Sequence, residues 1–118
     1  MNKTKLLLIG AGVVVVVGAI VIISLNIIKP KMEAKNELNT KLLRNAETMY
    51  KAAVSQKKDL ATGPCLGLAN DDYVVDTVHN PRTADDDNKA NQCESYTLGQ
   101  AKHLIELDLK DGKLVRMK

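Results

Sequence analysis

The 118-residue sequence contains no tryptophan and no phenylalanine, and its aromatic residues are three tyrosines. A core without large rings is built from aliphatic side chains, so any globular part of the chain is small and thinly cored. The sequence also lacks a phosphate-cradling glycine loop, a nucleophile elbow and paired carboxylates in an apolar setting. Basic residues are few and unaccompanied by aromatics, which leaves no evident nucleic-acid site. These absences argue against an enzyme, a cofactor and a small-molecule substrate.

Charged residues are missing from Leu6–Ile28, where Ser24 and Asn26 are the only polar side chains. A helix over these positions would rise roughly 34 Å, against about 30 Å for the hydrocarbon core of a bilayer. The alternative is a buried core helix of a soluble protein, but the rest of the chain is too small to cover it on all sides. We therefore predict a transmembrane helix over 6–28, in contact with membrane lipid, after a basic tail at 1–5.

Small residues within this span are candidates for helix–helix packing. Gly12 and Ala19 lie seven positions apart and share a helix face, and Gly18 pairs in the same way with an alanine. In lipid, small residues let helices approach closely. The span contains no GxxxG motif, so the pattern is a weak indication of self-association or of packing with related membrane subunits.

The orientation of the chain is contested by two signals. Lys3 and Lys5 favour a cytoplasmic N-terminus, but residues 29–58 carry eight basic and three acidic side chains and follow the span closely. Two cysteines, Cys65 and Cys93, favour the opposite side for the rest of the chain, because a disulfide persists only in an oxidising compartment. No cleavage site follows the span. We expect an uncleaved signal anchor with a cytoplasmic N-terminus and an extracytoplasmic head.

An amphipathic helix is predicted over residues 29–58. Its apolar positions recur at steps of three or four: Leu38, Leu42, Ala46, Met49 and Ala53. Pro30 means that the helix either restarts there or continues with a bend. Leu38, Leu42 and Met49 are the candidate packing residues of this stripe.

Residues 59–118 predict a small antiparallel β head, which makes the fold class α+β. Gly63-Pro64 ends the helix region, Tyr73–Val78 reads as a strand, 79–91 as a polar loop and Ser95–Leu98 as a short strand. A Cys65–Cys93 disulfide would staple this thin core. The head carries seven basic and eleven acidic residues. The basic helix and the acidic head could steer like subunits together or attract anionic lipid headgroups, or both could be ordinary solvated surfaces.

The C-terminus predicts a β-hairpin around Asp111-Gly112. A tight two-residue turn would place Arg116 beside Leu107 on the apolar face. A type I turn with Gly112 in a left-handed bulge instead sets Val115 and Met117 opposite Leu107 and Ile105, and pairs Glu106 with Arg116. The second register satisfies both faces. We expect its apolar face to cover Leu42, Met49 and Ala53.

Metal or acid–base chemistry has weak support in the sequence. His103 begins a strand and is interpreted as a structural or edge residue, and His79 with Cys65, Cys93 and His103 matches no compact zinc motif. The run Asp85–Asn88 offers oxygen ligands suited to calcium but lacks the alternating order of a preformed loop, which favours a solvated loop. We expect no metal.

The architecture resembles the type IV pilin and pseudopilin family. The similarity lies in the stretch Ile23–Ile28 with its lysine-rich continuation, in Ala46–Ala53 and in the closing hairpin Glu106–Val115. The family's prepilin peptidase site, a glycine before an aromatic residue and a glutamate inside the apolar run, is missing, since no acidic residue precedes Glu33. The resemblance implies either a divergent member anchored without processing or architectural convergence.

Two classes of function follow. The first is a membrane-anchored structural subunit that assembles through its helix into a filament or envelope complex. The second is a bitopic accessory protein that presents a small extracytoplasmic head to a partner.

Overall fold

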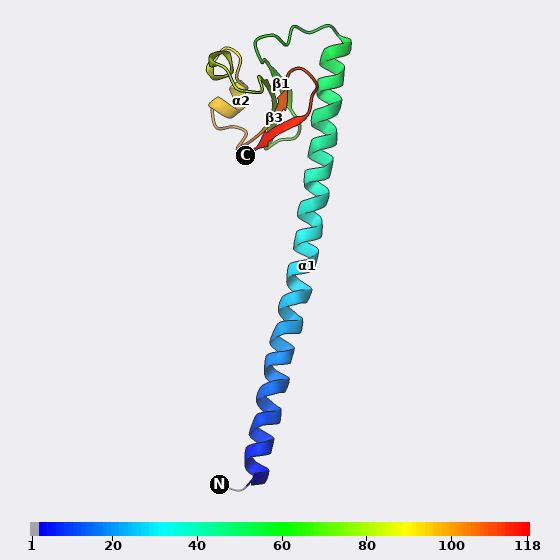
Figure 1. Cartoon of the computed structure of the whole chain (residues 1–118), viewed down its shortest axis with the longest axis vertical. Coiled ribbons are helices and arrows are strands. Elements are labelled where there is room, and N and C mark those ends of the chain that lie inside the picture. The colour runs from blue at the N-terminus through cyan, green and yellow to red at the C-terminus, as the bar shows by residue number, and fades with distance from the viewer. Residues whose placement is uncertain (1–2) are drawn as a thin grey trace. The chain divides into compact units, whose positions relative to one another are not determined.

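The computed structural model describes the backbone of residues 3–118 and the side chains of residues 13–24 and 28–118. Figure 1 shows the order of elements: α1 (Lys3–Ser55), β1 (Cys65–Leu68), β2 (Tyr73–Val78), η1 (Ala84–Asp87), α2 (Glu94–Thr97), β3 (His103–Asp108) and β4 (Leu114–Met117). The chain divides into two compact units, one ending at Leu38 and one formed by Asn39–Lys118, here called the head unit. The predicted α+β class, a long N-terminal helix and a small sheet, is confirmed.

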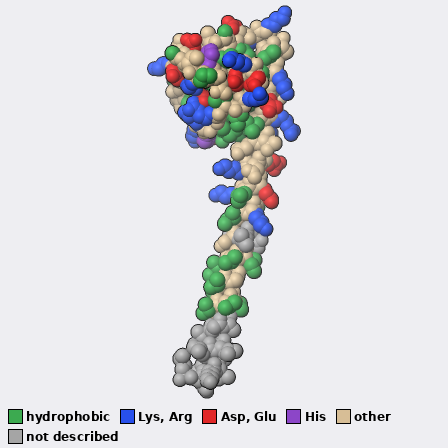
Figure 2. All heavy atoms as spheres, in the orientation of Figure 1, with side chains coloured by type: hydrophobic (Ala, Val, Ile, Leu, Met, Phe, Trp, Pro, Cys, Tyr) green, Lys and Arg blue, Asp and Glu red, His purple; other side chains and the backbone are tan. Residues whose placement is uncertain are grey.

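Helix α1 contains a segment that could cross a membrane. It has 53 residues and continues through Pro30 instead of restarting there. An 18-residue stretch within Val13–Ser55 has a mean hydropathy of 2.4, and none of that stretch is buried. Figure 2 shows hydrophobic side chains gathered along this part of the helix. By length and composition, α1 is therefore suited to a single membrane crossing.

The C-terminus of α1 is closed by a Schellman motif. Lys57 adopts a left-handed conformation with φ 55°. Its N–H donates to the carbonyl of Val54 at 3.0 Å, and the N–H of Lys58 donates to the carbonyl of Ala53 at 2.9 Å. These bonds satisfy carbonyls that the helix end would leave unpaired. The helix consequently ends at Ser55, three residues before the predicted limit.

The sheet is mixed, which corrects the expectation of an antiparallel head. Its order is β1-β2-β3-β4, and β2 pairs with β3 in parallel, while the two outer pairings are antiparallel. Parallel neighbours require a crossover of a dozen or more residues, and residues 79–102 supply it. Both inner strands are therefore brought into direct register although they are far apart in the sequence.

One face of the sheet packs against the part of α1 that belongs to the head unit. Leu42 and Ala46 are fully buried in a cluster with Val75, Ile105 and Leu107. Met49, partly buried, packs against the same cluster, and Ala53 is also buried. The predicted packing roles of Leu42 and Met49, under the apolar face of β3, are thus confirmed.

The hairpin between β3 and β4 follows the predicted register at two of its three pairs. Ile105 pairs with Met117 and Glu106 with Arg116, and Gly112 is left-handed with φ 71°. Leu107, however, pairs with Leu114 rather than with Val115. The register shifts between Glu106 and Leu107, so Val115 becomes the extra residue of a bulge and stays exposed.

Gly112 is also the point where the hairpin meets α1. A Cβ at this position would lie 2.7 Å from Cε1 of the Tyr50 ring, which leaves no room for a side chain. The Tyr50 hydroxyl donates to the carbonyl of Leu109 at 3.1 Å. The turn residue is therefore required both for its left-handed backbone and for close packing on the helix.

The crossover covers the other face of the sheet. Val74 and Leu104 pack there with Ala101 and Cys93, and Tyr96 packs against them. Residues Ser95–Leu98, expected as a strand, instead contribute to the short helix α2. A segment of four residues is too short for its hydrophobic pattern to distinguish a strand from a helical turn. The helical turn begins after Cys93, because the Cys93 carbonyl accepts the N–H groups of Tyr96 and Thr97 at 3.0 Å.

Candidate functional site: a polar pocket in the head

The two inner strands bury a pair of carboxylates side by side. Asp76 on β2 and Glu106 on β3 occupy partner positions of the parallel ladder, so both project from the face that the crossover covers. Their exposed fractions are 4% and 2%. Buried carboxylates are costly unless they are paired or protonated. This pair is not evident from the sequence, because its two members are thirty positions apart.

Glu106 is compensated by two arginines. Arg82 Nη1 donates to its Oε1 at 2.7 Å, and Arg116 Nε donates to its Oε2 at 2.5 Å. Burial alone would raise the pKa of Glu106, but the hydrogen bonds from Arg116 and Arg82 outweigh burial and lower it. Arg82 also reaches Asp87 Oδ1 at 2.9 Å. Glu106 is consequently an anion held inside a network of charge-assisted hydrogen bonds.

Asp76 is not compensated in this way. Its Oδ1 accepts the N–H of Thr77 at 3.0 Å, and no other hydrogen bond reaches the carboxyl group from the described part of the chain. Burial, the negative charge of Glu106 and that of Asp86 raise the pKa of Asp76 to about 7, against the opposing effects of the Thr77 hydrogen bond and of Arg82. Near neutral pH this buried group exchanges a proton, which is uncommon for an aspartate.

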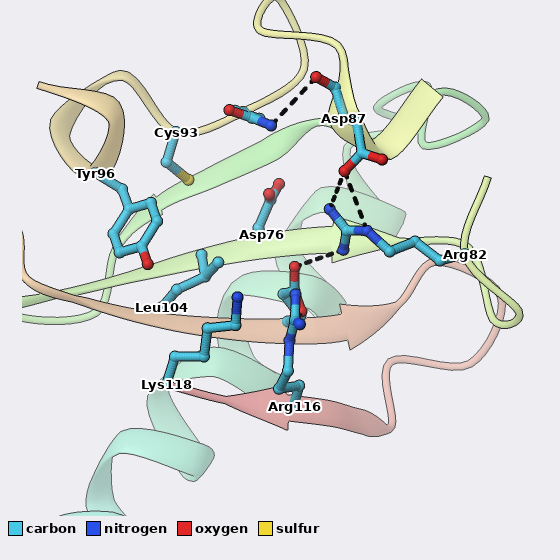
Figure 3. Close-up of a pocket in the computed structure, with 10 residues that line it drawn as sticks. Asp76, Arg82, Asp87, Cys93, Tyr96, Leu104, Arg116 and Lys118 are labelled. Atoms are coloured by element: carbon cyan, nitrogen blue, oxygen red, sulfur yellow. Dashed lines mark hydrogen bonds and ion pairs between the residues drawn. The ribbon is translucent and has the colours of Figure 1, made fainter. Parts of the chain in front are cut away.

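Around these groups lies a cavity of about 210 Å³, shown in Figure 3. Its lining includes charged and polar side chains from both inner strands, the crossover and the C-terminal strand: Asp76, Arg82, Tyr96, Glu106, Arg116 and Lys118. The pocket combines three positively charged side chains with three carboxyl groups, of which Asp76 has its pKa raised to about 7.

The predicted disulfide joins the crossover to the edge of the sheet. Cys65 at the start of β1 and Cys93 before α2 are bonded, with a Cα–Cα distance of 4.9 Å. Cys93 is buried and lines the pocket. The disulfide therefore holds in place the segment that forms one wall of the pocket.

The acidic run Asp85–Asn88 is not simply a solvated loop. Asp86 is buried, and its Oδ1 accepts from the backbone N–H of His79 at 3.0 Å and lies 2.9 Å from its Nδ1, while its Oδ2 accepts from the N–H of Thr83 at 2.7 Å. Burial opposes ionisation, yet the hydrogen bonds from Thr83 and His79 lower the pKa of Asp86. Both carboxylate oxygens are occupied by the chain's own donors, so Asp86 orders the loop and is not free for a cation.

His103 lies apart from the pocket's charged network. Its ring stacks on Tyr73 of β2 with centroids 4.5 Å apart, and its Nε2 is 3.5 Å from Asp72. This agrees with the structural role predicted for it.

The helix-packing candidates of the N-terminal unit are not brought to any site. A Cβ on Gly18 would meet nothing within 4 Å, Ala19 is exposed, and Leu38 is 45% exposed. Gly12 lies outside the residues whose side chains the structure describes. Sequence reasoning missed Asp76, although an acid inside the apolar run Tyr73–Val78 was a usable signal.

Comparisons with protein-family models, with curated proteins and with solved structures found no match to this chain.

Proposed function

We propose that this protein is a single-pass membrane-anchored structural subunit, pilin-like in architecture, that assembles through its helix with copies of itself or related subunits. The observation that carries the proposal is a contrast along α1. Leu42 and Ala46 are buried by the head unit, whereas the valines and isoleucines of residues 13–23 are 50–72% exposed. An apolar surface of this extent needs lipid or neighbouring helices to cover it. The role proposed is not enzymatic and involves no nucleic acid.

Two further features support assembly over a solitary anchor. Gly18 has no side chain and Ala19 only a methyl group, so a neighbouring helix can approach α1 closely at these positions. The helix region 29–58 has a net charge of +5 and residues 59–118 one of −4, so neighbouring subunits present opposite charges to one another. The likeness to pilins implies the same mode of packing, without the processing site of that family.

Cross-linking of the full chain in native membranes tests the assembly. We expect a ladder of multimers that is weakened when Gly12 and Ala19 are both changed to leucine, because larger side chains hold the helices apart. The matched control changes Val14 and Val21 to leucine, which are also seven positions apart but on the opposite helix face. A monomer in all membranes, or equal ladders in both variants, would contradict assembly through this face.

The proposed orientation places the head outside the cytoplasm, in agreement with the Cys65–Cys93 disulfide. Intact cells treated with a membrane-impermeant maleimide, before and after mild reduction, test it. We expect labelling of both cysteines only after reduction. Thiols that are free and protected until the cells are lysed would instead place the head in the cytoplasm.

A second candidate is a bitopic accessory protein whose head binds a partner, and the polar pocket is the observation that favours it. The head unit Asn39–Lys118 is compact by itself. The accessory function requires that this unit, produced without the span, folds and retains its ligand. An insoluble fragment, or one that binds nothing, would count for the structural subunit.

A further inference from the structure

The lining of the head pocket contains donors that nothing in the described chain uses. Arg116 engages Glu106 through Nε, which leaves its two terminal nitrogens without a hydrogen-bond partner in the described residues. The Nζ of Lys118 and the hydroxyl of Tyr96 are likewise unpaired there. The lining also has an acceptor without a partner in the described residues: the Oδ2 of Asp76, a residue that is almost completely buried.

The charge of the pocket decides which kind of ligand it favours. Three cationic groups, Arg82, Arg116 and Lys118, line it, but only Glu106 and Asp87 are its fixed anions. The remaining carboxyl group of the lining, Asp76, is uncharged whenever it is protonated. Among the side chains of the lining there is then one more positive than negative charge, at Lys118 and the terminal nitrogens of Arg116. A ligand cation would be repelled, whereas a single negative charge would balance the excess.

We propose that the head pocket binds a small carboxylate, held by Lys118 and the terminal nitrogens of Arg116, with the protonated carboxyl of Asp76 donating a hydrogen bond to it. The planar edge of a guanidinium matches the two oxygens of a carboxylate. At about 210 Å³ the cavity has room for a molecule of only a few heavy atoms. The inference concerns the head alone and does not depend on assembly through α1.

Proton uptake accompanies this binding. Glu106 stays ionised because of its two arginines, and the other charged side chains of the lining are Asp87, Arg82, Arg116 and Lys118. Asp86 lies outside the lining, but its negative charge also raises the pKa of Asp76. Burial holds the pKa of Asp76 at about 7, so an ionised Asp76 above that pH would oppose a second negative charge. Carboxylate affinity should therefore fall as the pH rises through neutrality.

The test is a titration of the ¹⁵N-labelled full chain in detergent micelles, followed by NMR. Acetate and lactate are the carboxylate probes, ethylammonium is the cation and phosphate the competing oxyanion. We expect saturable shifts with the carboxylates at the amides of residues that line the pocket. Saturation by ethylammonium but not by acetate, tighter binding of phosphate than of either carboxylate, or no saturable shift with any probe would overturn the proposal.

Two variants separate the site from general charge effects. Lys118→Gln should weaken acetate binding about tenfold, the loss of one charged contact. Lys110→Gln removes the same charge from an exposed position in the hairpin turn and should change nothing. In Asp76→Asn the affinity for acetate should no longer depend on pH between about pH 6 and about pH 8, because the amide donates a hydrogen bond without a proton that titrates there. Equal effects of the two lysine variants, or an unchanged pH dependence in Asp76→Asn, would show that these residues do not form a carboxylate site.

Discussion

Replacing Asp76 with asparagine should make the head more stable at alkaline pH, although the change removes a native side chain. The folded protein keeps the Asp76 proton up to about pH 7, whereas an unperturbed aspartate releases it near 3.8. Between these values the folded state binds more protons than the unfolded state, so the free energy of unfolding falls as the pH rises. Asparagine has the same size, carries no proton to lose and can still accept the Thr77 N–H.

The magnitude follows from the same shift. Each unit of pKa corresponds to about 1.36 kcal/mol, so the stability present below pH 3.8 and lost as the pH rises through about 7 is at most about 4 kcal/mol. Wild type and Asp76→Asn should be about equally stable near pH 4, and the variant more stable by about 2–4 kcal/mol near pH 8. Glu106 and Asp86, whose pKa values are lowered, have the opposite sign: their contribution is present above about pH 4 and is lost as the pH falls. Comparing the two proteins cancels that contribution.

Urea unfolding of the full chain in mild detergent, followed by tyrosine fluorescence, is the assay. The three tyrosines, Tyr50, Tyr73 and Tyr96, all belong to the head unit, so the signal reports on the head without interference from the span. Asp85→Asn is the matched control, since it makes the same chemical change at an exposed position. A stability difference between wild type and Asp76→Asn that stays constant from about pH 5 to about pH 8 would refute the burial of an ionisable Asp76.

Three further predictions use the same unfolding assay. Gly63→Ala should lower the free energy of unfolding by about 2–4 kcal/mol, because φ is +71° and the new Cβ would lie 2.7 Å from a carbonyl oxygen of β2. Gly99→Ala is the control: φ is +73° but the Cβ would meet nothing, so the loss should be only about 1 kcal/mol. Equal losses would mean that the close contact at Gly63 is not real. Changing Cys65 and Cys93 together to serine should lower the free energy of unfolding by about 3–4 kcal/mol, given their sequence separation of 28. Reduction of the wild-type disulfide should produce the same loss. If neither change lowers stability, the disulfide does not stabilise the head. Leu42→Ala should cost about 2–5 kcal/mol, since that side chain is 1% exposed, and circular dichroism should show that most of the helix signal survives.

The sequence by itself determined the features that depend on local pattern. An uncharged run of this length is long and apolar enough to cross a membrane as a helix. The helical stripe identified Leu42 and Met49, because residues three and four apart share a face. The Cys65–Cys93 pair and the left-handed Gly112 also followed from residue type and spacing.

The tertiary structure alone decided which strands are neighbours, and with that the site. Asp76 and Glu106 are thirty positions apart and meet only because residues 79–102 return the chain in parallel to β2. The same crossover adds Arg82 to one side of Glu106, while the hairpin adds Arg116 to the other. Whether a carboxylate is neutral or charged depends on burial and on neighbouring donors, which are set by packing between distant segments. Asp76 and Glu106 are therefore alike in the sequence and opposite in the folded head: one is left with a raised pKa and an open oxygen, and the other is held as an anion between two arginines.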